Sequence, residues 1–190
     1  MDISFKKISV IGLGLIGTSI LHAIKSKFGK EVITFAYDIE PKHRDIVRQL
    51  SIATFVSNKI SNSVKEADLV ILAIPVGSME SVANLIAPHL KENALVTDTG
   101  STKASVLKDV GPNLPNNVFF IPSHPIAGTE YSGPQSGFSS LFENRYWLIV
   151  SEIKTENTEK LLNFFSKLGS KVEIVSIEYH DRILAITSHL

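Results

Sequence analysis

The sequence predicts an α/β fold, a doubly wound and mostly parallel sheet with helices on both faces. Short β-rich runs alternate with segments of helical spacing along most of the 190 residues. Residues 67–74 form a continuous apolar run, which is typical of a strand buried on both faces of a parallel sheet. A glycine-rich turn at residues 12–17 separates the first expected strand from the first expected helix. Together these observations favour parallel strands joined by crossover helices.

The individual elements follow from local pattern. Strands are expected where β-branched and other apolar residues cluster, at residues 7–11, 31–37, 52–56, 67–74, 94–97, 118–121, 146–150 and 171–175. Helices are expected where apolar side chains recur every three or four residues. These segments are residues 14–27, 41–50, 78–90 and 102–110, and a helix carrying Leu161, Leu162, Phe165 and Leu168 on one face. We expect residues 1–176 to form one compact domain.

Residues 177–190 have a different pattern. Tyr179, Ile183, Ile186 and Leu190 lie at helical spacing, but no glycine, proline or basic final turn follows them. We therefore expect a helix that begins a further domain, in a sequence that is a fragment of a longer protein. The alternative is a natural chain end at Leu190.

Composition limits the classes of partner. The 19 basic and 19 acidic residues cancel, which gives no electrostatic reason to expect a nucleic acid or an anionic membrane surface as partner. The chain has no cysteine, and its six histidines show no metal-ligand spacing, so no metal site is expected. The apolar runs are far shorter than the roughly 20 residues that span a bilayer. These features predict a cytoplasmic protein.

The glycine-rich turn predicts a dinucleotide site in a Rossmann-like fold. In Gly12-Leu13-Gly14-Leu15-Ile16-Gly17, the first glycine permits a tight turn, the second lets the backbone approach a pyrophosphate, and the third allows close helix–strand packing. The amino end of the following helix offers free N–H groups to the phosphates. Asp38 ends the second expected strand, 21 residues after Gly17.

Asp38 favours NAD over NADP. Its carboxylate can accept hydrogen bonds from the adenosine ribose, whereas a 2′-phosphate would place like charges together, at a cost of about 4 kcal/mol per pair at about 4 Å and an effective dielectric of about 20. Lys42, His43 and Arg44 are close enough in sequence to weaken this preference. An alternative role for Asp38 is to cap the helix that follows.

A candidate chemical site follows the expected strand at 118–121. Residues 123–130 read Ser-His-Pro-Ile-Ala-Gly-Thr-Glu, which predicts a loop carrying a base, a hydroxyl and an acid at the carboxyl edge of the sheet. His124, with an ordinary pKa near 6.5, is suited to accept a proton. Thr129 could bind substrate or cap a turn. Glu130 could orient His124, bind a substrate hydroxyl or be solvated.

Other segments contribute weaker candidates. Ser101 could cap the helix that follows it, contact substrate, or do both, and Lys103 is expected to be a solvated surface charge. The loop with Gly133, Pro134 and Gly137 could fold over the nicotinamide pocket, and Arg145 could hold that loop or touch a ligand.

These segments together resemble the prephenate/arogenate dehydrogenase family of tyrosine biosynthesis. The resemblance is carried by GLGLIG (12–17), AIPV (73–76), DTGSTK (98–103), SHPIAGTE (123–130) and ITSHL (186–190). It implies that His124 is catalytic, that Ser101 assists it, and that substrate contacts come from Ser101, Thr129, Glu130 and His189. It also implies an NAD site composed of Gly12, Leu13, Gly14, Leu15, Ile16, Gly17, Asp38, Ile74, Pro75, Val76 and Thr99.

The resemblance further implies what lies beyond the chain given. The family's terminal motif reads SHLPH and opens a helical domain that dimerises and supplies an arginine for the substrate carboxylate, whereas this sequence stops at Leu190. The expected full-length protein is a homodimer, and the 190-residue form is expected to be poorly active.

The reaction implied is NAD-dependent oxidative decarboxylation of prephenate to 4-hydroxyphenylpyruvate, with His124 as the base. Arogenate is the alternative substrate. Two other readings remain open, a different dehydrogenase on the same scaffold and a non-catalytic NAD-binding module if the chain ends naturally at Leu190.

Overall fold

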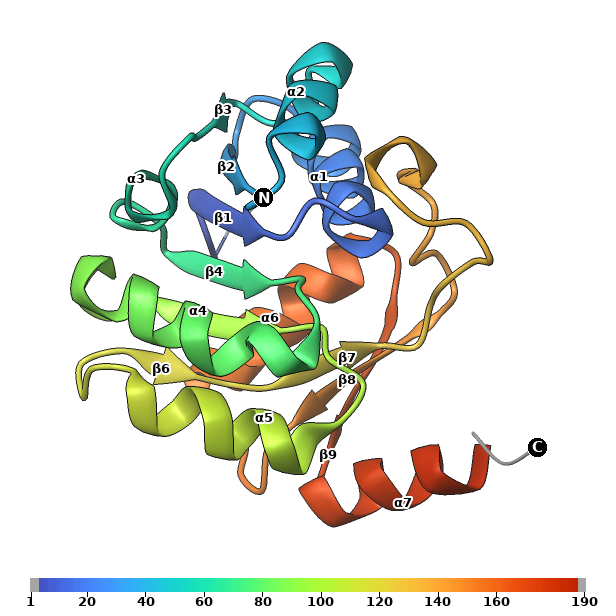
Figure 1. Cartoon of the computed structure of the whole chain (residues 1–190). Helices are drawn as coiled ribbons and strands as arrows, with labels where there is room; N and C mark the ends of the chain where they lie inside the picture. Colours follow the sequence, from blue (N-terminus) through green and yellow to red (C-terminus); the bar gives the residue numbers. More distant parts are fainter. Residues whose placement is uncertain (1–3, 188–190) are drawn as a thin grey trace.

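The computed structural model describes residues 4–187, with side chains as far as Arg182. Its central sheet has six parallel strands in the order β3-β2-β1-β4-β5-β6 (Figure 1). The strands are β1 (Lys7–Ile11), β2 (Ile33–Tyr37), β3 (Phe55–Val56), β4 (Leu69–Leu72), β5 (Leu95–Asp98) and β6 (Phe119–Phe120). This order reverses direction between β1 and β4, where open α/β sheets bind dinucleotides.

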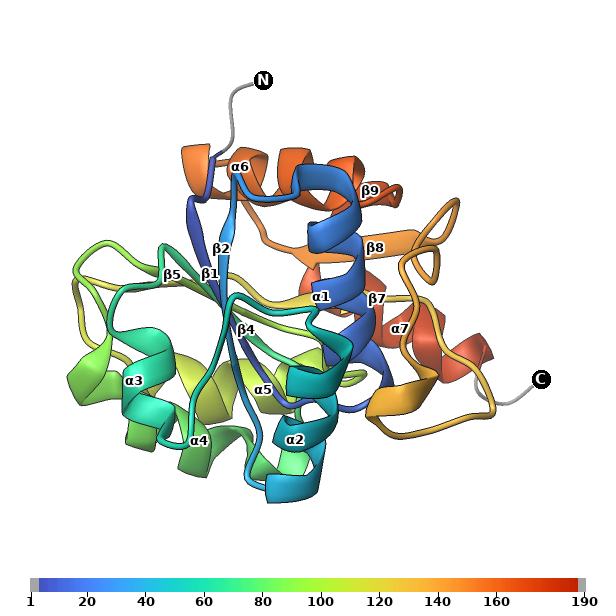
Figure 2. The same cartoon turned by 90° about the horizontal axis from the view of Figure 1, so that it is seen from above.

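Helices cover both faces of this sheet, as the sequence predicted. One face carries α1 (Leu15–Phe28), α2 (Pro41–Leu50) and α6 (Glu156–Lys167), and the other carries α3 (Ile60–Val64), α4 (Met79–Ile86) and α5 (Lys103–Val110). Figure 2 shows α6 on one side of the sheet and α3, α4 and α5 on the other. Strand β4 contributes side chains to the hydrophobic cores on both faces of the sheet. Leu69 and Ile71 pack on the first face, and Val70 and Leu72 pack on the second.

A second sheet lies beside the first and corrects two expectations. Ser123–Pro125, expected as a loop, form strand β7, which pairs antiparallel with β8 (Tyr146–Val150), and β8 pairs parallel with β9 (Lys171–Val175). The strands at 146–150 and 171–175 are therefore confirmed, but they do not extend the central sheet. Because β7 is three residues long and contains a proline, its local sequence carries no strand signal.

Element boundaries differ from the expected ones mainly at helix ends. The expected helix at 78–90 is α4 flanked by 3₁₀ turns at Val76–Ser78 and Ala87–His89, where Pro88 cannot continue the α-helix. The five-residue α3 was missed because it is too short to display a helical repeat. Within residues 4–187, no helix is both long and apolar enough to cross a membrane.

The last described helix, α7 (Ile177–Thr187), packs against α5 and β8. Tyr179, the first residue of the expected apolar stripe, is exposed. The side chains of Ile183 and Ile186 and the whole of His189 and Leu190 lie outside the described part of the chain. That residues 177–190 begin a further domain stays a prediction.

Candidate active site

The candidate site lies at the carboxyl ends of the parallel strands, where two groups of residues meet. The glycine-rich turn joins β1 to α1, and Asp38 follows β2 directly. Asp98 ends β5, and His124 lies on β7, which begins soon after β6. Ligands bind at this edge in open α/β sheets.

The glycine-rich turn has the space and backbone geometry that a pyrophosphate needs. Gly12 has φ +93°, and a Cβ there would lie 2.2 Å from the carbonyl oxygen of Ala73. A Cβ at Gly17 would lie 1.9 Å from the carbonyl oxygen of Gly12, so the helix packs directly on the turn. A Cβ at Gly14 would meet no atom within 4 Å. Gly14 is itself the amino-terminal cap residue of α1, so no side chain caps the N–H groups at this helix end.

Asp38 ties the turn to β2. One carboxylate oxygen accepts a hydrogen bond from the Leu13 backbone N–H at 2.7 Å and lies 3.2 Å from Nδ1 of His43, and the other accepts from the Glu40 N–H at 2.8 Å. The amino-terminal cap of α2 is Glu40, so the alternative role of Asp38 as the cap of that helix is wrong. Arg44 donates to the carbonyl oxygens of Asp38 and Ile39. Both His43 and Arg44 therefore contact Asp38, as the sequence suggested they could.

A cavity of about 430 Å³ opens beside Asp38. Five of the expected cofactor residues line it, namely Gly12, Gly14, Asp38, Ile74 and Pro75. Leu13 is buried in the core beneath the turn, and Leu15, Ile16, Gly17, Val76 and Thr99 do not line the cavity. The lining residues that sequence reasoning missed include Ile39, Ile60, Val82 and Leu85. Ile39 follows Asp38 directly, which was a usable signal, whereas α3 and α4 reach the cavity only through the fold.

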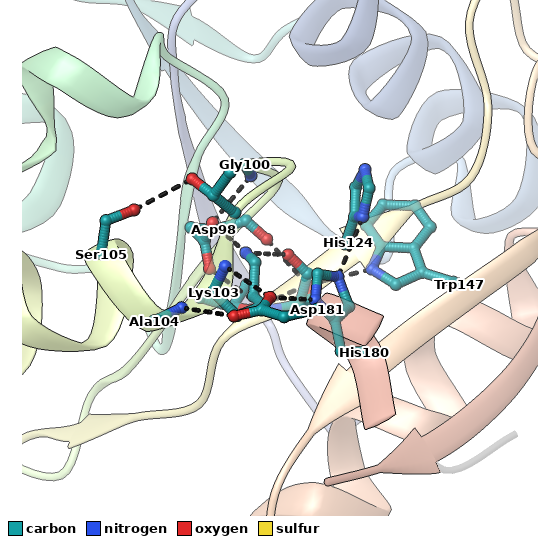
Figure 3. Close-up of polar contacts among 12 residues, drawn as sticks. Asp98, Gly100, Lys103, Ala104, Ser105, His124, Trp147, His180 and Asp181 are labelled. Atoms are coloured by element: carbon teal, nitrogen blue, oxygen red, sulfur yellow. Dashed lines mark hydrogen bonds and ion pairs between the residues drawn. The ribbon is translucent and has the colours of Figure 1, made fainter. Parts of the chain in front are cut away.

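His124 is partly buried, and its surroundings favour the neutral imidazole. Burial, the charge of Lys103 and the neighbouring His180 lower the pKa of His124 to about 4. Its Nδ1 lies 3.1 Å from Nε2 of His180, and Nδ1 of His180 lies 2.8 Å from an oxygen of Asp181. The other ring nitrogen of His124 points away from His180 (Figure 3). A neutral imidazole with one nitrogen so directed can act as a base.

Lys103 is completely buried, so the prediction that it is a solvated surface charge is wrong. Its Nζ lies 2.5 Å from Asp98, which is also fully buried, and donates to the backbone carbonyl of Ser123 at 2.7 Å. Burial raises the pKa of Asp98 and lowers the pKa of Lys103, and each charge opposes the shift of the other. The ion pair joins the end of β5 to β7, next to His124 (Figure 3).

Ser123 fixes the backbone position of His124. Its hydroxyl donates to the Asp98 carbonyl at 2.8 Å and accepts from Thr97 Oγ1 and from Nε1 of Trp147, both at 3.0 Å. Trp147 is buried and stacks on Phe165 with ring centroids 3.8 Å apart. The residue before His124 is thus anchored to both sheets and to the core.

The remaining expected site residues lie apart from this network. Ser101 is exposed, and the amino-terminal cap of α5 is Thr102, so the expected cap at Ser101 is wrong. Thr129 is exposed and closes a turn with Tyr131. Glu130 is also exposed, and the side chain that contacts His124 is His180.

The loop after Glu130 packs on α1 beside the glycine-rich turn. A Cβ at Gly137 would lie 2.2 Å from Thr18 Oγ1, and the Phe138 N–H donates to Ser19 Oγ at 3.1 Å. Arg145 is exposed on the approach to β8. The part of the chain that the structure describes contains no group of three or more histidines and carboxylates arranged to hold a metal ion.

The chain is also similar to a known protein family and to several of its members. Residues 22–174 match the family described as prephenate dehydrogenase, nucleotide-binding domain. The cyclohexadienyl dehydrogenase of Zymomonas mobilis is 40% identical over 188 residues, which are 98% of this chain and 64% of that protein. A probable arogenate/prephenate dehydrogenase of Methanocaldococcus jannaschii is 35% identical over 96% of this chain and 39% of its own length.

A solved structure is also similar. The prephenate dehydrogenase of Aquifex aeolicus, in complex with hydroxyphenyl propionate and NAD⁺, superimposes with a TM-score of 0.88 at 28% identity, over the whole of this chain and 66% of that one. The chain thus spans about two fifths to two thirds of the length of these three relatives.

Proposed function

Because the chain belongs to the prephenate dehydrogenase family through its nucleotide-binding domain, we propose that it serves the NAD-dependent oxidative decarboxylation of prephenate to 4-hydroxyphenylpyruvate, with His124 as the base. NAD is the cofactor of this domain, in agreement with the complex of the A. aeolicus relative. The observation that carries the proposal is the neutral, partly buried His124, with one ring nitrogen on His180 and the other directed away.

The reaction divides between cofactor and protein. NAD, when bound, supplies a hydride acceptor. His124 takes the proton of the ring hydroxyl as the hydride leaves the same carbon. Loss of the ring carboxylate as carbon dioxide leaves its electron pair in the ring, which becomes aromatic, and the phenol oxygen recovers the proton. Prephenate and NAD⁺ give 4-hydroxyphenylpyruvate, carbon dioxide and NADH, so the proton is not consumed.

The protein contributes placement as well as the base. The buried Asp98–Lys103 pair and the anchored Ser123 hold the backbone on which His124 lies. Such placement of reacting groups supplies a large part of a typical enzymatic rate enhancement. We include Ser101, Thr129, Glu130 and His189 in the proposed substrate site on the strength of the family resemblance, and Val76 and Thr99 in the cofactor site on the same basis.

Arogenate is the second candidate substrate, favoured by the name of the M. jannaschii relative. It carries an amino group where prephenate carries a keto group, at a distance from the reacting ring. The proposed chemistry at His124 is the same for both substrates.

The test is steady-state NAD reduction with prephenate and with arogenate, in two lengths of the protein. Because this chain covers about two thirds or less of the three relatives described above, we propose that residues after Leu190 help to bind the substrate and pair two subunits. We expect the 190-residue form to bind NAD but to turn over prephenate poorly, and an extended form to be active. Equal rates at matched concentration would show that residues 1–190 hold the complete site. Absence of turnover of either substrate by the extended form would refute the proposed reaction.

A further inference from the structure

No role for His180 or Asp181 was apparent from the sequence, yet both belong to the network around His124. His180 is completely buried on α7, and its two ring nitrogens lie within hydrogen-bond distance of His124 and Asp181. A buried imidazole between another imidazole and a carboxylate leaves few arrangements of protons. These contacts therefore constrain which nitrogen of His124 carries hydrogen.

Asp181 determines which ring nitrogen of His180 carries hydrogen. Its carboxylate accepts hydrogen bonds from the backbone N–H groups of Lys103 at 3.3 Å and Ala104 at 3.4 Å, at the amino end of α5. Although burial opposes it, the hydrogen bond from His180 holds the pKa of Asp181 below its ordinary value. The N–H groups and the helix end also favour the ionised carboxylate. An ionised carboxylate only accepts hydrogen bonds, so Nδ1 of His180 must donate.

The proton positions of both rings follow from that donor and from the complete burial of His180, which disfavours a charged ring. A neutral His180 protonated on Nδ1 has an unprotonated Nε2, which can only accept. The partner at 3.1 Å is Nδ1 of His124, so Nδ1 of His124 carries the hydrogen. The Nε2 atom of His124, directed away from this network, is then left with its lone pair (Figure 3). This is the form of the ring that a base requires.

We propose that His180 and Asp181 are positioning residues that hold His124 in the Nδ1–H tautomer and so aim the lone pair of Nε2 at the substrate. The proposal rests on the proposed role of His124 as the base. The other charged groups that face His124 are Lys103 from α5 and its ion-pair partner Asp98 from β5. Lys103 and Asp98 bond to each other and to the backbone of β7, and the contact with Nδ1 of His124 comes from His180.

The tautomer can be measured directly in the unmodified 190-residue chain. Long-range ¹H–¹⁵N correlation spectra distinguish protonated from unprotonated ring nitrogens, and the signals of His124 are identified by their loss in His124→Asn. We expect His124 to be protonated on Nδ1 at neutral pH, although free histidine prefers Nε2. Protonation on Nε2, or a mixture like that of free histidine, would overturn the proposal without any change to His180.

Variants of His180 test the role. His180→Phe keeps a ring in the buried space but removes the acceptor, so we expect His124 to lose its Nδ1–H preference. In the active, extended protein kcat should fall about 10- to 100-fold, the range found when a metal-bound histidine loses the partner that orients it, with NAD affinity unchanged. His180→Gln places an amide oxygen near the lost Nε2 and should recover part of kcat. The exposed His89, changed to Gln, is the matched control and should alter neither the spectrum nor the rate.

The outcomes separate this proposal from the proposed function. If His124 keeps its Nδ1–H tautomer in folded His180→Phe, the positioning role is wrong even where His124→Asn abolishes turnover. If His124→Asn leaves turnover intact, His124 is not the base and the positioning role for catalysis falls with it. Equal loss of kcat in His180→Phe and His180→Gln, with the tautomer intact in both, would indicate a packing role and would also overturn the proposal.

Discussion

The glycine-rich turn and the His124 network lie at the same edge of the molecule but are assembled differently. The turn, α1 and Asp38 belong to one continuous strand–helix–strand unit, residues 7–38, and their contacts are largely made by backbone atoms. The His124 network draws side chains from β5, α5, β7, β8 and α7, spread over residues 97–181 (Figure 3). A site made by local backbone geometry can be recognised from the spacing of residues in the sequence. A network of side chains that are distant in sequence can be recognised only in the folded structure.

The two regions also differ in how their charged side chains are stabilised. At the cofactor side, Asp38 remains next to an open cavity and is held mainly by N–H groups. In the His124 network, Asp98 and Lys103 are fully buried and neutralise each other. Burying charges is costly unless they are paired, so the stability of the His124 network should be far more sensitive to loss of a single charged partner.

The largest expected effect comes from breaking the buried pair. Lys103→Met leaves Asp98 buried without a counter-charge, and we expect the free energy of unfolding to fall by about 3–5 kcal/mol in urea titrations. The double change Asp98→Asn with Lys103→Met should recover part of that loss. The exposed pair Lys7–Glu66 is the control, and Lys7→Met should have little measurable effect. Equal losses at the two lysines would contradict the distinction between the regions.

The next largest effect separates chemistry from cofactor binding. In the extended protein, His124→Asn should lower turnover at least about 10²-fold, the low end of general-base contributions, because asparagine cannot take the proton. NAD affinity, measured by calorimetry, should be nearly unchanged. Near-parental turnover of prephenate would mean that the base is elsewhere.

The pH dependence of the same reaction gives an independent check. Since the pKa of His124 is lowered to about 4, the imidazole is neutral and competent at pH 7 and becomes protonated only as the pH falls toward 4. We expect kcat/KM to be flat with respect to this group from about pH 8 to 6 and to fall below about pH 5. An acid limb centred near 6.5, the ordinary value for histidine, would show that the burial and charge described here do not act on His124.

A smaller effect is expected at the cofactor turn. Gly14→Ala adds a methyl group to open space, so the free energy of unfolding should change by less than about 0.5 kcal/mol. NAD binding should weaken about tenfold, or about 1.4 kcal/mol, because the backbone can no longer approach the pyrophosphate closely. Calorimetry and urea titration on the same preparation measure both. Undiminished NAD affinity would show that the phosphates do not lie on Gly14.

The smallest effect concerns the choice of cofactor. The 190-residue chain should bind NAD at least several-fold more tightly than NADP, because the Asp38 carboxylate repels a 2′-phosphate. His43 and Arg44 contact Asp38 and limit the size of this preference. Asp38→Asn should bring the affinities for NAD and NADP closer together, because it removes the negative charge. Equal affinities in the unmodified chain, or tighter NADP binding, would rule out the assignment of Asp38 to the ribose.

The sequence by itself determined the strands of the central sheet, most of its helices and the cofactor turn. Apolar runs, helical spacing and the three glycines act over a few residues, so they specify β1, α1, α2 and β8 without reference to the rest of the chain. His124 was singled out as a candidate base because its short motif follows an expected strand. Asp38 was placed correctly for the same reason, although its hydrogen bonds to Leu13 and Glu40 were not visible in the sequence.

Only the tertiary structure decided the surroundings of His124. Lys103 reads as a surface charge in its own helix, and it is buried because β7 and Asp98 close over it. His180 lies 56 residues from His124, and no local pattern relates the two. Side-chain burial depends on what packs from distant elements, so the sequence alone showed neither the pairing of residues 123–125 with β8 nor the burial that favours a neutral His124.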